Sequence, residues 1–233
     1  IYGTVNPDPT LGQTIEIAEQ MAQFQPDTII AIGGGSALDA AKIARFIYEY
    51  SLDQPAGFLD SYEKVSELFT RLQQKFIDIR KRIVKFHHQL NTKLVAVPTT
   101  SGTGSEVTPY AVITDDNTHV KYPLTDYELT PQIAIVDPEF VMTVPKHTVA
   151  WSGLDSLSHA LESYVSVMAS DFTRPWSLQA IKLVFENLAE SYKFDPKHPT
   201  REGEKARENM HYAACLAGMA FANAFLGINH SLA

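Results

Sequence analysis

The chain has 233 residues, of which 45% are hydrophobic and 20% are charged, and its formal net charge is −8. This composition suits one large domain or two modest ones with a buried core, and it excludes a disordered polymer. Nucleic acid is not expected as a partner because phosphate binding needs a concentrated basic face, and no membrane partner is expected because no apolar run approaches about 18 residues.

The first predicted elements are a helix over residues 14–25 and a strand over residues 28–32, whose β-branched apolar run is typical of a strand buried on both faces. Glycines and a serine follow directly, and Ser36 with Asp39 makes an S-x-x-D start for the next helix. A strand that leads through glycines into a helix N-terminus is the outline of a phosphate site. A tight turn without a ligand explains these glycines equally well.

A loop over residues 53–60 precedes a long amphipathic helix over residues 62–84. The apolar stripe of this helix indicates core packing first, and a partner surface is the alternative. Its basic run at residues 80–82 is interpreted as a solvated face.

A second buried strand is predicted over residues 93–97, and a loop rich in hydroxyl groups and glycine follows it at residues 98–106. Short donors and bare backbone can surround an anion, so this loop indicates a site for a diphosphate, a ribose or an amide. In an open parallel sheet ligands bind outside the carboxyl ends of the strands, where both glycine loops would lie. Strands over residues 110–114 and 132–136 complete the α/β part. Lys121, between them, could reach a nucleotide or could be an ordinary surface lysine.

Helical periodicity dominates the rest of the chain, with helices over residues 148–168, 174–192 and 201–225. The last helix is rich in alanine and glycine, which permit close approach in a tight bundle. It contains Cys215, the only cysteine, so no disulfide can form within the chain and a reducing, cytoplasmic compartment is expected. We interpret this cysteine as a small buried hydrophobic residue. Because the sequence starts without methionine and stops inside a helical pattern, we expect a fragment that lacks both ends.

Asp155 and His159 stand at i and i+4 on one helix face, so both could donate lone pairs to one divalent cation. An isolated pair of this kind is more often a surface ion pair. His230 follows near the chain end, where a hydrogen-bonded core imidazole is the plain alternative. Together with the two loops, these residues predict a nucleotide-dependent metalloenzyme with an α/β half and a helical half.

Several short motifs follow one another along the chain in a characteristic order and spacing. They are Ile-Gly-Gly-Gly-Ser at 32–36 with Asp-Ala-Ala-Lys at 39–42, Pro-Thr-Thr-Ser-Gly-Thr-Gly-Ser-Glu-Val-Thr at 98–108, Gly-Leu-Asp at 153–155 with His-Ala-Leu-Glu at 159–162, and Gly227 with His230. Together they resemble the iron-containing alcohol dehydrogenases across nearly the whole chain. Residues 76–83 and 222–227 look like the C-terminal alcohol dehydrogenase domain of the bifunctional aldehyde–alcohol dehydrogenases, which reduce acetyl-CoA to ethanol in fermentation.

The resemblance implies an α/β plus all-α fold of dehydroquinate synthase-like architecture. A Rossmann-like, parallel-sheet NAD-binding domain would cover residues 1–145, and a helical metal-binding domain would cover residues 146–233. The implied metal ligands are Asp155, His159 and His230. The implied NAD contacts are Gly34, Gly35, Ser36, Asp39, Thr99, Thr100, Gly102, Thr103 and Lys121. The family pattern also has a nucleotide-binding strand before Ile1. Beyond Ala233 it has a fourth ligand, another histidine, and a further histidine that helps to relay the proton.

The implied reaction is reversible hydride transfer between NAD(H) and a short-chain aldehyde, such as acetaldehyde, and its alcohol. Iron(II) is the expected metal and zinc the alternative. NADP is not excluded, because the residue that reads the ribose 2′ position would lie before Ile1. Two other functions stay open: an enzyme like glycerol dehydrogenase or dehydroquinate synthase, and a filament-assembly module. Because full-length bifunctional relatives form helical filaments, a homo-oligomer or filament is expected.

Overall fold

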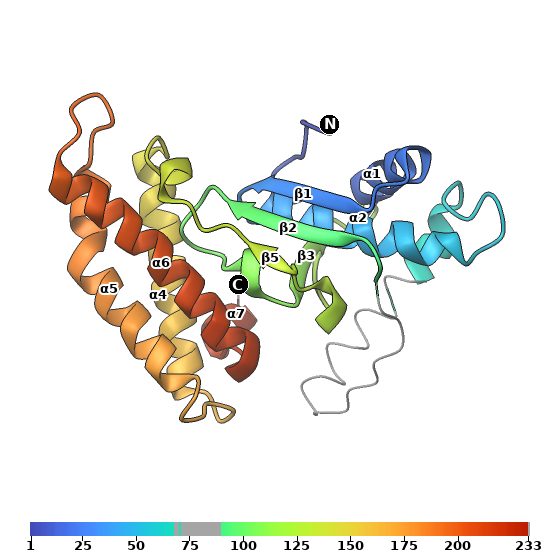
Figure 1. Cartoon of the computed structure of the whole chain (residues 1–233). Coiled ribbons are helices and arrows are strands. Elements are labelled where there is room, and N and C mark those ends of the chain that lie inside the picture. Colours follow the sequence, from blue (N-terminus) through green and yellow to red (C-terminus); the bar gives the residue numbers. More distant parts are fainter. Residues whose placement is uncertain (68–69, 71–89, 233) are drawn as a thin grey trace. The chain divides into compact units, whose positions relative to one another are not determined.

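The computed structural model describes residues 1–67, 70 and 90–232 and contains two compact units (Figure 1). Unit 1 comprises Ile1–Ala96 and Pro109–Ile133, and unit 2 comprises Val97–Thr108 and Ala134–Ala233. The glycine and hydroxyl loop therefore belongs to the second unit, whereas the sequence assigns it to the first domain. The predicted division into residues 1–145 and 146–233 stays a prediction about the domains.

Most of the helix predicted over residues 62–84, including its basic run, lies outside the described residues. Its beginning, residues 62–67, is helical.

Unit 1 is built around helix α2 (Gly35–Leu52), which packs against helix α1 (Leu11–Phe24). Helix α1 begins where the Thr10 hydroxyl accepts a hydrogen bond from the Gln13 N–H at 3.2 Å, and it ends before Pro26 at a left-handed Gln25. The buried residues that join the two helices include Leu11, Ile15, Ala18, Ile43 and Ile47. Their helical spacing gives each helix one apolar face, which is the reason the pair excludes water.

A three-stranded sheet in the order β1-β2-β5 lies beside α2. Its strands are β1 (Thr28–Gly33), β2 (Lys93–Pro98) and β5 (Ile133–Ala134). The Lys93 N–H donates to the Asp27 carbonyl at 2.9 Å, and the Gln132 N–H donates to the Leu94 carbonyl at 3.0 Å. The strands therefore start side by side and run parallel, as predicted.

The prediction that the first strand is buried on both faces is wrong for the described part of the chain. Ile30 and Ile32 of β1 are 64% and 56% exposed, whereas Ala31 is buried against Leu38 of α2. The reason is that, among the described residues, α2 covers the face of β1 on which Ala31 lies, whereas Ile30 and Ile32 point to the other face. A β-branched apolar run reports strand propensity and not how many faces are covered.

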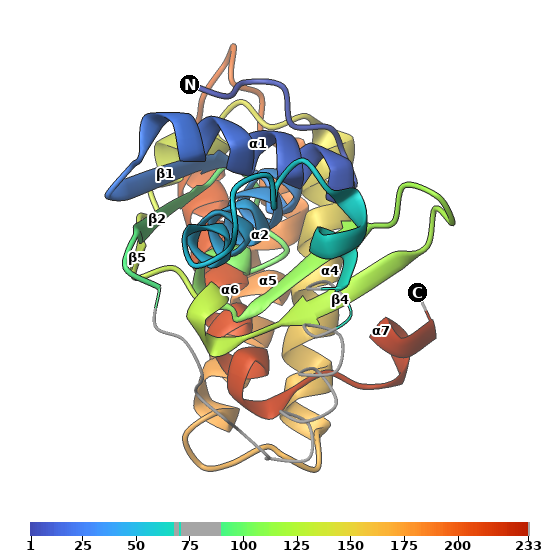
Figure 2. The same cartoon turned by 90° about the vertical axis from the view of Figure 1, so that its right-hand side faces the viewer.

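A separate antiparallel pair joins β3 (Tyr110–Thr114) to β4 (Lys121–Thr125) and packs on α2 (Figure 2). The buried Lys42 ammonium of α2 donates to the Tyr110 carbonyl at 2.7 Å, and Asp39 accepts from the Val112 N–H at 2.9 Å. Strand β4 was not predicted because Pro123 interrupts its pattern. Proline is tolerated there because β4 is an edge strand.

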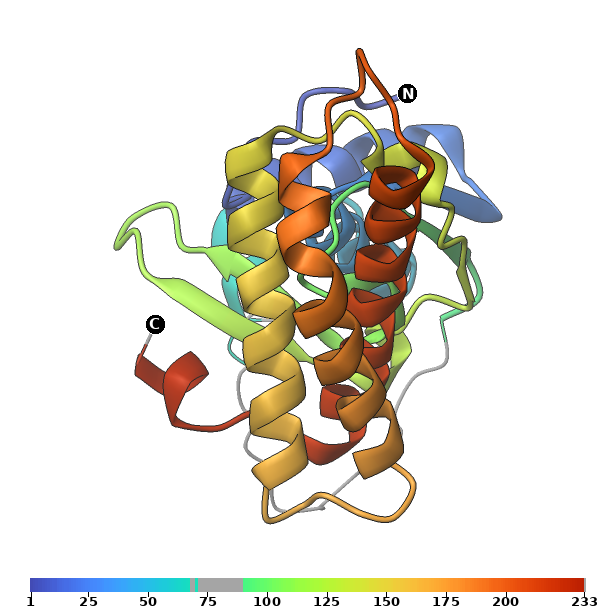
Figure 3. The same ribbon diagram turned by 90° about the vertical axis from the view of Figure 1, so that its left-hand side faces the viewer.

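Unit 2 contains three long helices that lie side by side, α4 (Lys146–Val165), α5 (Arg174–Lys193) and α6 (Arg201–Ala224), followed by the short α7 (Ile228–Leu232) (Figure 3). All three long helices were predicted, with ends shifted by no more than a few residues. Ala160, Ala180 and Ala217 meet in a common core, so the small side chains let the helices approach closely. These two units confirm the predicted fold class.

Among the described helices, none combines the length and the apolar character that crossing a membrane requires.

Candidate functional site

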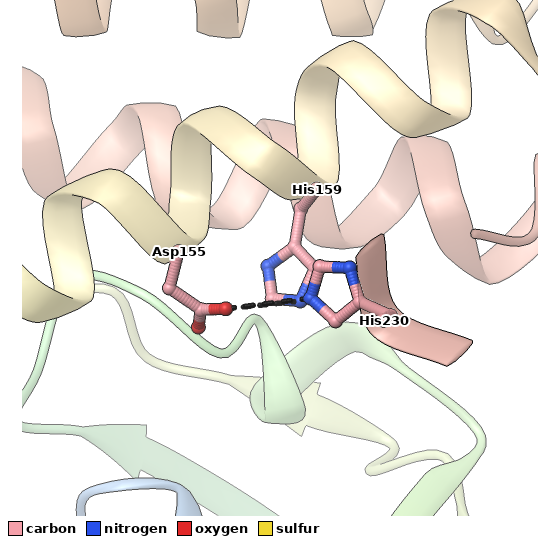
Figure 4. A group of neighbouring side chains, drawn as sticks. All are labelled: Asp155, His159 and His230. Carbon is pink, nitrogen blue, oxygen red and sulfur yellow. Dashed lines mark hydrogen bonds and ion pairs between the residues drawn. The ribbon is translucent and has the colours of Figure 1, made fainter. Parts of the chain in front are cut away.

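Three predicted metal ligands converge in unit 2 (Figure 4). Helix α4 presents Asp155 and His159 on one face, and α7 brings His230 to the same place. Asp155 Oδ1 lies 3.6 Å from His159 Nε2 and 3.4 Å from His230 Nε2, and the two imidazole rings stack with centroids 4.5 Å apart. One potential ligand atom from each residue lies within 4.8 Å of the others.

His159 is held in the form that can bind a metal. Its Nδ1 lies 3.2 Å from the Gly102 carbonyl oxygen. A carbonyl can only accept a hydrogen bond, so Nδ1 carries the proton and the lone pair is on Nε2, toward Asp155. Burial lowers the pKa of His159, which keeps the ring neutral. A plain Asp–His ion pair would need a charged imidazolium, which the burial of His159 disfavours.

His230 depends on a residue that the sequence analysis did not assign, Glu162 of α4. Glu162 accepts from His230 Nδ1 at 2.5 Å and from the Asn229 N–H at 2.6 Å. The hydrogen bond to Asp155, and also that to Glu162, raise the pKa of His230. Burial alone would raise the pKa of Glu162, but its bonds to His230 and to backbone N–H groups lower it.

A sequence signal for Glu162 was available, because Asp155, His159 and Glu162 are spaced at i, i+4 and i+7 on one helix face. The backbone also approaches this carboxylate closely. A Cβ atom added to Gly227 would lie 2.9 Å from Glu162 Oε1. Glycine at 227 thus lets the chain that leads into α7 pass against the carboxylate.

The donor set fits a divalent transition metal. Two imidazole nitrogens and one carboxylate oxygen are ligands that iron, zinc and cobalt accept, and catalytic zinc sites use three protein ligands with a further position open. His159 is buried, whereas the side chains of Asp155 and His230 are 36% and 24% exposed. The cluster is therefore reachable from the side of Asp155 and His230.

Five of the predicted NAD contacts lie in unit 1. The expectation that Ser36 is the N-cap of α2 is wrong. The N-cap is Gly34, and no side chain makes a capping hydrogen bond there. The Ser36 hydroxyl instead accepts from the Asp8 N–H at 3.3 Å, and Asp8 pairs with the exposed Lys121 at 2.8 Å. The structure thus brings Lys121 near Ser36 through Asp8. Asp39 has the structural role described above, and Gly35 is the first residue of α2.

The other four predicted contacts, Thr99, Thr100, Gly102 and Thr103, lie in the loop of unit 2. Thr99 and Thr100 are partly exposed, and Thr103 is exposed with its hydroxyl accepting from the Ser105 N–H at 3.3 Å. Gly102 is buried, and its carbonyl contacts His159, one of the predicted metal ligands. The NAD roles of all nine residues stay predictions.

Comparisons with known proteins cover both units. The family model described as iron-containing alcohol dehydrogenase matches residues 1–138, and the C-terminal model of the Fe-containing alcohol dehydrogenase family matches residues 149–233. An aldehyde-alcohol dehydrogenase of Streptococcus pneumoniae is 53% identical over 100% of the chain, which covers 24% of that protein. An NADPH-dependent butanol dehydrogenase of Clostridium saccharobutylicum is 44% identical over 98% of the chain, which covers 52% of that protein.

Solved structures show the same likeness. An iron-containing alcohol dehydrogenase from Thermococcus thioreducens superimposes with a TM-score of 0.78 and 33% identity, covering 99% of the chain and 54% of that structure. A sulfoacetaldehyde reductase from Bifidobacterium kashiwanohense, in complex with NAD+, gives a TM-score of 0.76 and 27% identity over 99% of the chain and 54% of that structure. The chain thus spans about a quarter to a half of the length of these relatives. With family models matching both of its units, the chain belongs to the iron-containing alcohol dehydrogenase family.

Proposed function

We propose that this chain forms part of a metal- and NAD-dependent alcohol dehydrogenase that interconverts acetaldehyde and ethanol, within a fermentative bifunctional aldehyde–alcohol dehydrogenase. The observation that carries the proposal is the convergence of Asp155, His159 and His230 from two separate helices. The similar proteins bear the names of alcohol and aldehyde-alcohol dehydrogenases, which favours this activity over that of a glycerol dehydrogenase, a dehydroquinate synthase or a filament module.

Asp155, His159 and His230 would hold the ion. The family description favours iron(II), and zinc is the alternative because it binds such donors more tightly than iron(II). When bound, the ion would supply Lewis-acid chemistry, lowering the pKa of the alcohol hydroxyl or polarising the aldehyde carbonyl.

The chain's own residues prepare this site. Gly102 and Glu162 occupy the Nδ1 atoms of the two imidazoles, so both Nε2 atoms face Asp155. The Phe221 ring packs against the His159 ring with centroids 4.4 Å apart, and it excludes water from that side of the ligand. Substrate would approach from the exposed side of Asp155 and His230.

For the cofactor we propose contacts from both loops. In unit 1, α2 begins at Gly34 without a side-chain cap, and the Ala37 N–H donates to the Gly34 carbonyl at 3.0 Å, so the N–H groups of Gly35 and Ser36 would be the ones to face a phosphate. Ser36, Asp39 and Lys121 would complete that side together with Gly35. In unit 2, the contacts would come from Thr99, Thr100, Gly102 and Thr103. One relative is bound to NAD+ and another is NADPH-dependent, so turnover should be measured with both nucleotides.

The decisive experiment replaces ligands in the full-length protein. Asp155→Ala and His159→Ala should lower the metal content and ethanol-linked NADH formation together, because each variant removes one donor. His198→Ala is a matched control: His198 also pairs with an aspartate, Asp195 at 3.0 Å, but its side chain is 85% exposed and it lies in the connector between α5 and α6. Ethanol turnover that persists after the metal is lost would contradict the assignment. Turnover without net NADH would point to chemistry like that of a dehydroquinate synthase.

On the resemblance alone, we also propose that the whole protein is a cytoplasmic homo-oligomer or filament. Sedimentation and electron microscopy of the full-length protein test the assembly.

A further inference from the structure

The loop of residues 99–104 contacts His159, one of the three proposed metal ligands, although the composition of the loop suggested a nucleotide site. We propose that this loop also sets the ring orientation of His159, through the Gly102 carbonyl, and that Gly218 of α6 keeps the loop in place. The inference rests on the proposed function, because it assigns the loop a positioning role toward a metal ligand. The loop, α4 and α6 all belong to unit 2.

The Gly102 carbonyl selects the tautomer of His159. Neutral imidazole has two tautomers, and the hydrogen bond at one nitrogen decides which nitrogen keeps its lone pair. With Nδ1 donating to Gly102 at 3.2 Å, Nε2 has its lone pair toward Asp155. If this carbonyl moved away, the proton could shift to Nε2. It would then lie between the ring and Asp155 and block metal binding.

The backbone at Gly102 is pressed against α4. A Cβ atom at this position would lie 2.7 Å from Ser152 Cβ and 2.9 Å from the Ser152 carbonyl oxygen. Ser152 and His159 are separated by two helical turns, so they lie on the same face of α4. The close approach at Ser152 therefore aligns the Gly102 carbonyl with the ring of His159.

The other side of the loop is fixed on α6. Gly104 adopts a left-handed conformation with φ +63°, and a Cβ atom there would lie 2.7 Å from Gly218 Cα. In return, a Cβ atom on Gly218 would lie 2.9 Å from Gly104 Cα and 2.7 Å from Val107 Cγ2. The Ser101 hydroxyl adds a contact to Nδ1 of His211 at 3.2 Å. Residues on both sides of Gly102 are thus anchored to α6.

The test substitutes Gly218→Ala in the full-length protein. The new methyl group meets backbone atoms of Gly104, which cannot rotate away as a flexible side chain would, so the loop must shift and carry the Gly102 carbonyl with it. We expect Zn²⁺ affinity, measured by competition with a chromophoric chelator, to fall about 10- to 100-fold, the usual cost of losing a hydrogen-bond partner of a metal ligand. In the metal-free protein, nitrogen NMR of labelled histidine should show that His159 no longer holds its proton on Nδ1 alone.

Gly203→Ala is the matched control. Gly203 lies on the same helix, and a Cβ atom there would lie 2.5 Å from Phe194 Cδ2, far along α6 from the loop. This variant should lose stability but keep the Zn²⁺ affinity and the His159 tautomer of the wild type. Equal losses of Zn²⁺ affinity in both variants would overturn the proposal, since they would reflect general destabilisation. A folded Gly218→Ala protein with unchanged affinity and tautomer would also overturn it.

A gentler variant covers the case in which Gly218→Ala does not fold. Ser101→Ala removes the hydroxyl contact to His211 and introduces no clash, and we expect Zn²⁺ affinity to fall about threefold, in line with the loss of a modest hydrogen bond. Unchanged Zn²⁺ affinity in Ser101→Ala would then overturn the proposal that the loop positions His159. If the wild-type protein itself binds no Zn²⁺, the proposed function fails, and the tautomer of His159 in the metal-free variants alone decides the present inference.

Discussion

Replacing Glu162 should weaken metal binding even though all three proposed ligands are retained. Glu162 accepts hydrogen bonds from His230 Nδ1 at 2.5 Å, from the Asn229 N–H at 2.6 Å and from the Gly227 N–H, and its side chain is 13% exposed. Helix α7 has just five residues, so it has little packing of its own to hold His230 toward Asp155. The carboxylate of Glu162 therefore docks this short helix on α4.

The magnitude follows from the two of these hydrogen bonds that come from α7, those of Asn229 and His230. A hydrogen bond to a charged group contributes about 1.5–3 kcal/mol, and each 1.4 kcal/mol or so corresponds to a tenfold change in an equilibrium constant. Glu162→Gln keeps a single acceptor oxygen for two donors, so we expect metal affinity to fall about tenfold. Glu162→Ala removes both acceptors, and we expect a fall of about 100-fold.

The assay is a metal titration of the full-length variants by chelator competition, with the wild type and Glu186→Ala measured alongside. Glu186 is an exposed glutamate of α5 that pairs with Lys182 at 3.9 Å, so its removal tests whether losing any helix carboxylate matters. We expect Glu162→Ala to bind the metal more weakly than Glu162→Gln, and Glu162→Gln more weakly than the wild type. Glu186→Ala should bind it as tightly as the wild type. Wild-type affinity in Glu162→Ala would refute the reasoning, because His230 would then be held by other contacts.

Three further predictions concern buried or half-buried groups. Burial lowers the pKa of His211 from 6.5 to about 4, so its contribution to stability is present above the unfolded pKa and is lost as pH falls from 6.5 toward 4. That loss amounts to about 3 kcal/mol. When the free energy of unfolding is measured in urea near pH 7 and near pH 4, it should therefore fall less between the two pH values in His211→Gln than in the wild type. An equal fall in both proteins would contradict the prediction. Lys42→Met should lower the free energy of unfolding by about 3–5 kcal/mol, because it strips the buried ammonium from the Tyr110 carbonyl and from nearby Asp39; a change below about 1 kcal/mol in urea melts would show that the cation is dispensable. Burial, with the nearby charge of Glu106, raises the pKa of Cys215 to about 12. Alkylation of this thiol near pH 8, followed by mass spectrometry, should therefore be on the order of 10³-fold slower than that of free cysteine, and a rate like that of free cysteine would mean an accessible thiolate.

Much of the secondary structure was predictable from local pattern. The helices α4, α5 and α6 follow the 3.6-residue period of their apolar residues, and β2 and β3 follow from short β-branched runs. The pairing of Asp155 with His159 was also readable, because residues four apart on a helix always share a face. These features depend on near neighbours in the chain, and near neighbours are what a sequence pattern reports.

Other features needed the tertiary structure. His230 and Glu162 are 68 residues apart. They meet because α5 reverses the chain, α6 then runs in the same direction as α4 so that both helices end close together, and the chain turns at Phe225, which has φ +65°. The exposure of Ile30 depends on which elements cover that face of β1, and no periodicity encodes that.

The sequence by itself therefore determined the long helices α1, α2, α4, α5 and α6, most of the described strands and the residue types of the candidate site. Only the tertiary structure decided that the Gly102 carbonyl and the Glu162 carboxylate orient the two imidazoles. The physical reason is range. Backbone hydrogen bonding and hydrophobic period act over a few residues. The convergence of side chains from distant segments is decided by close packing of whole helices, where a single glycine contact can set the position of a carbonyl.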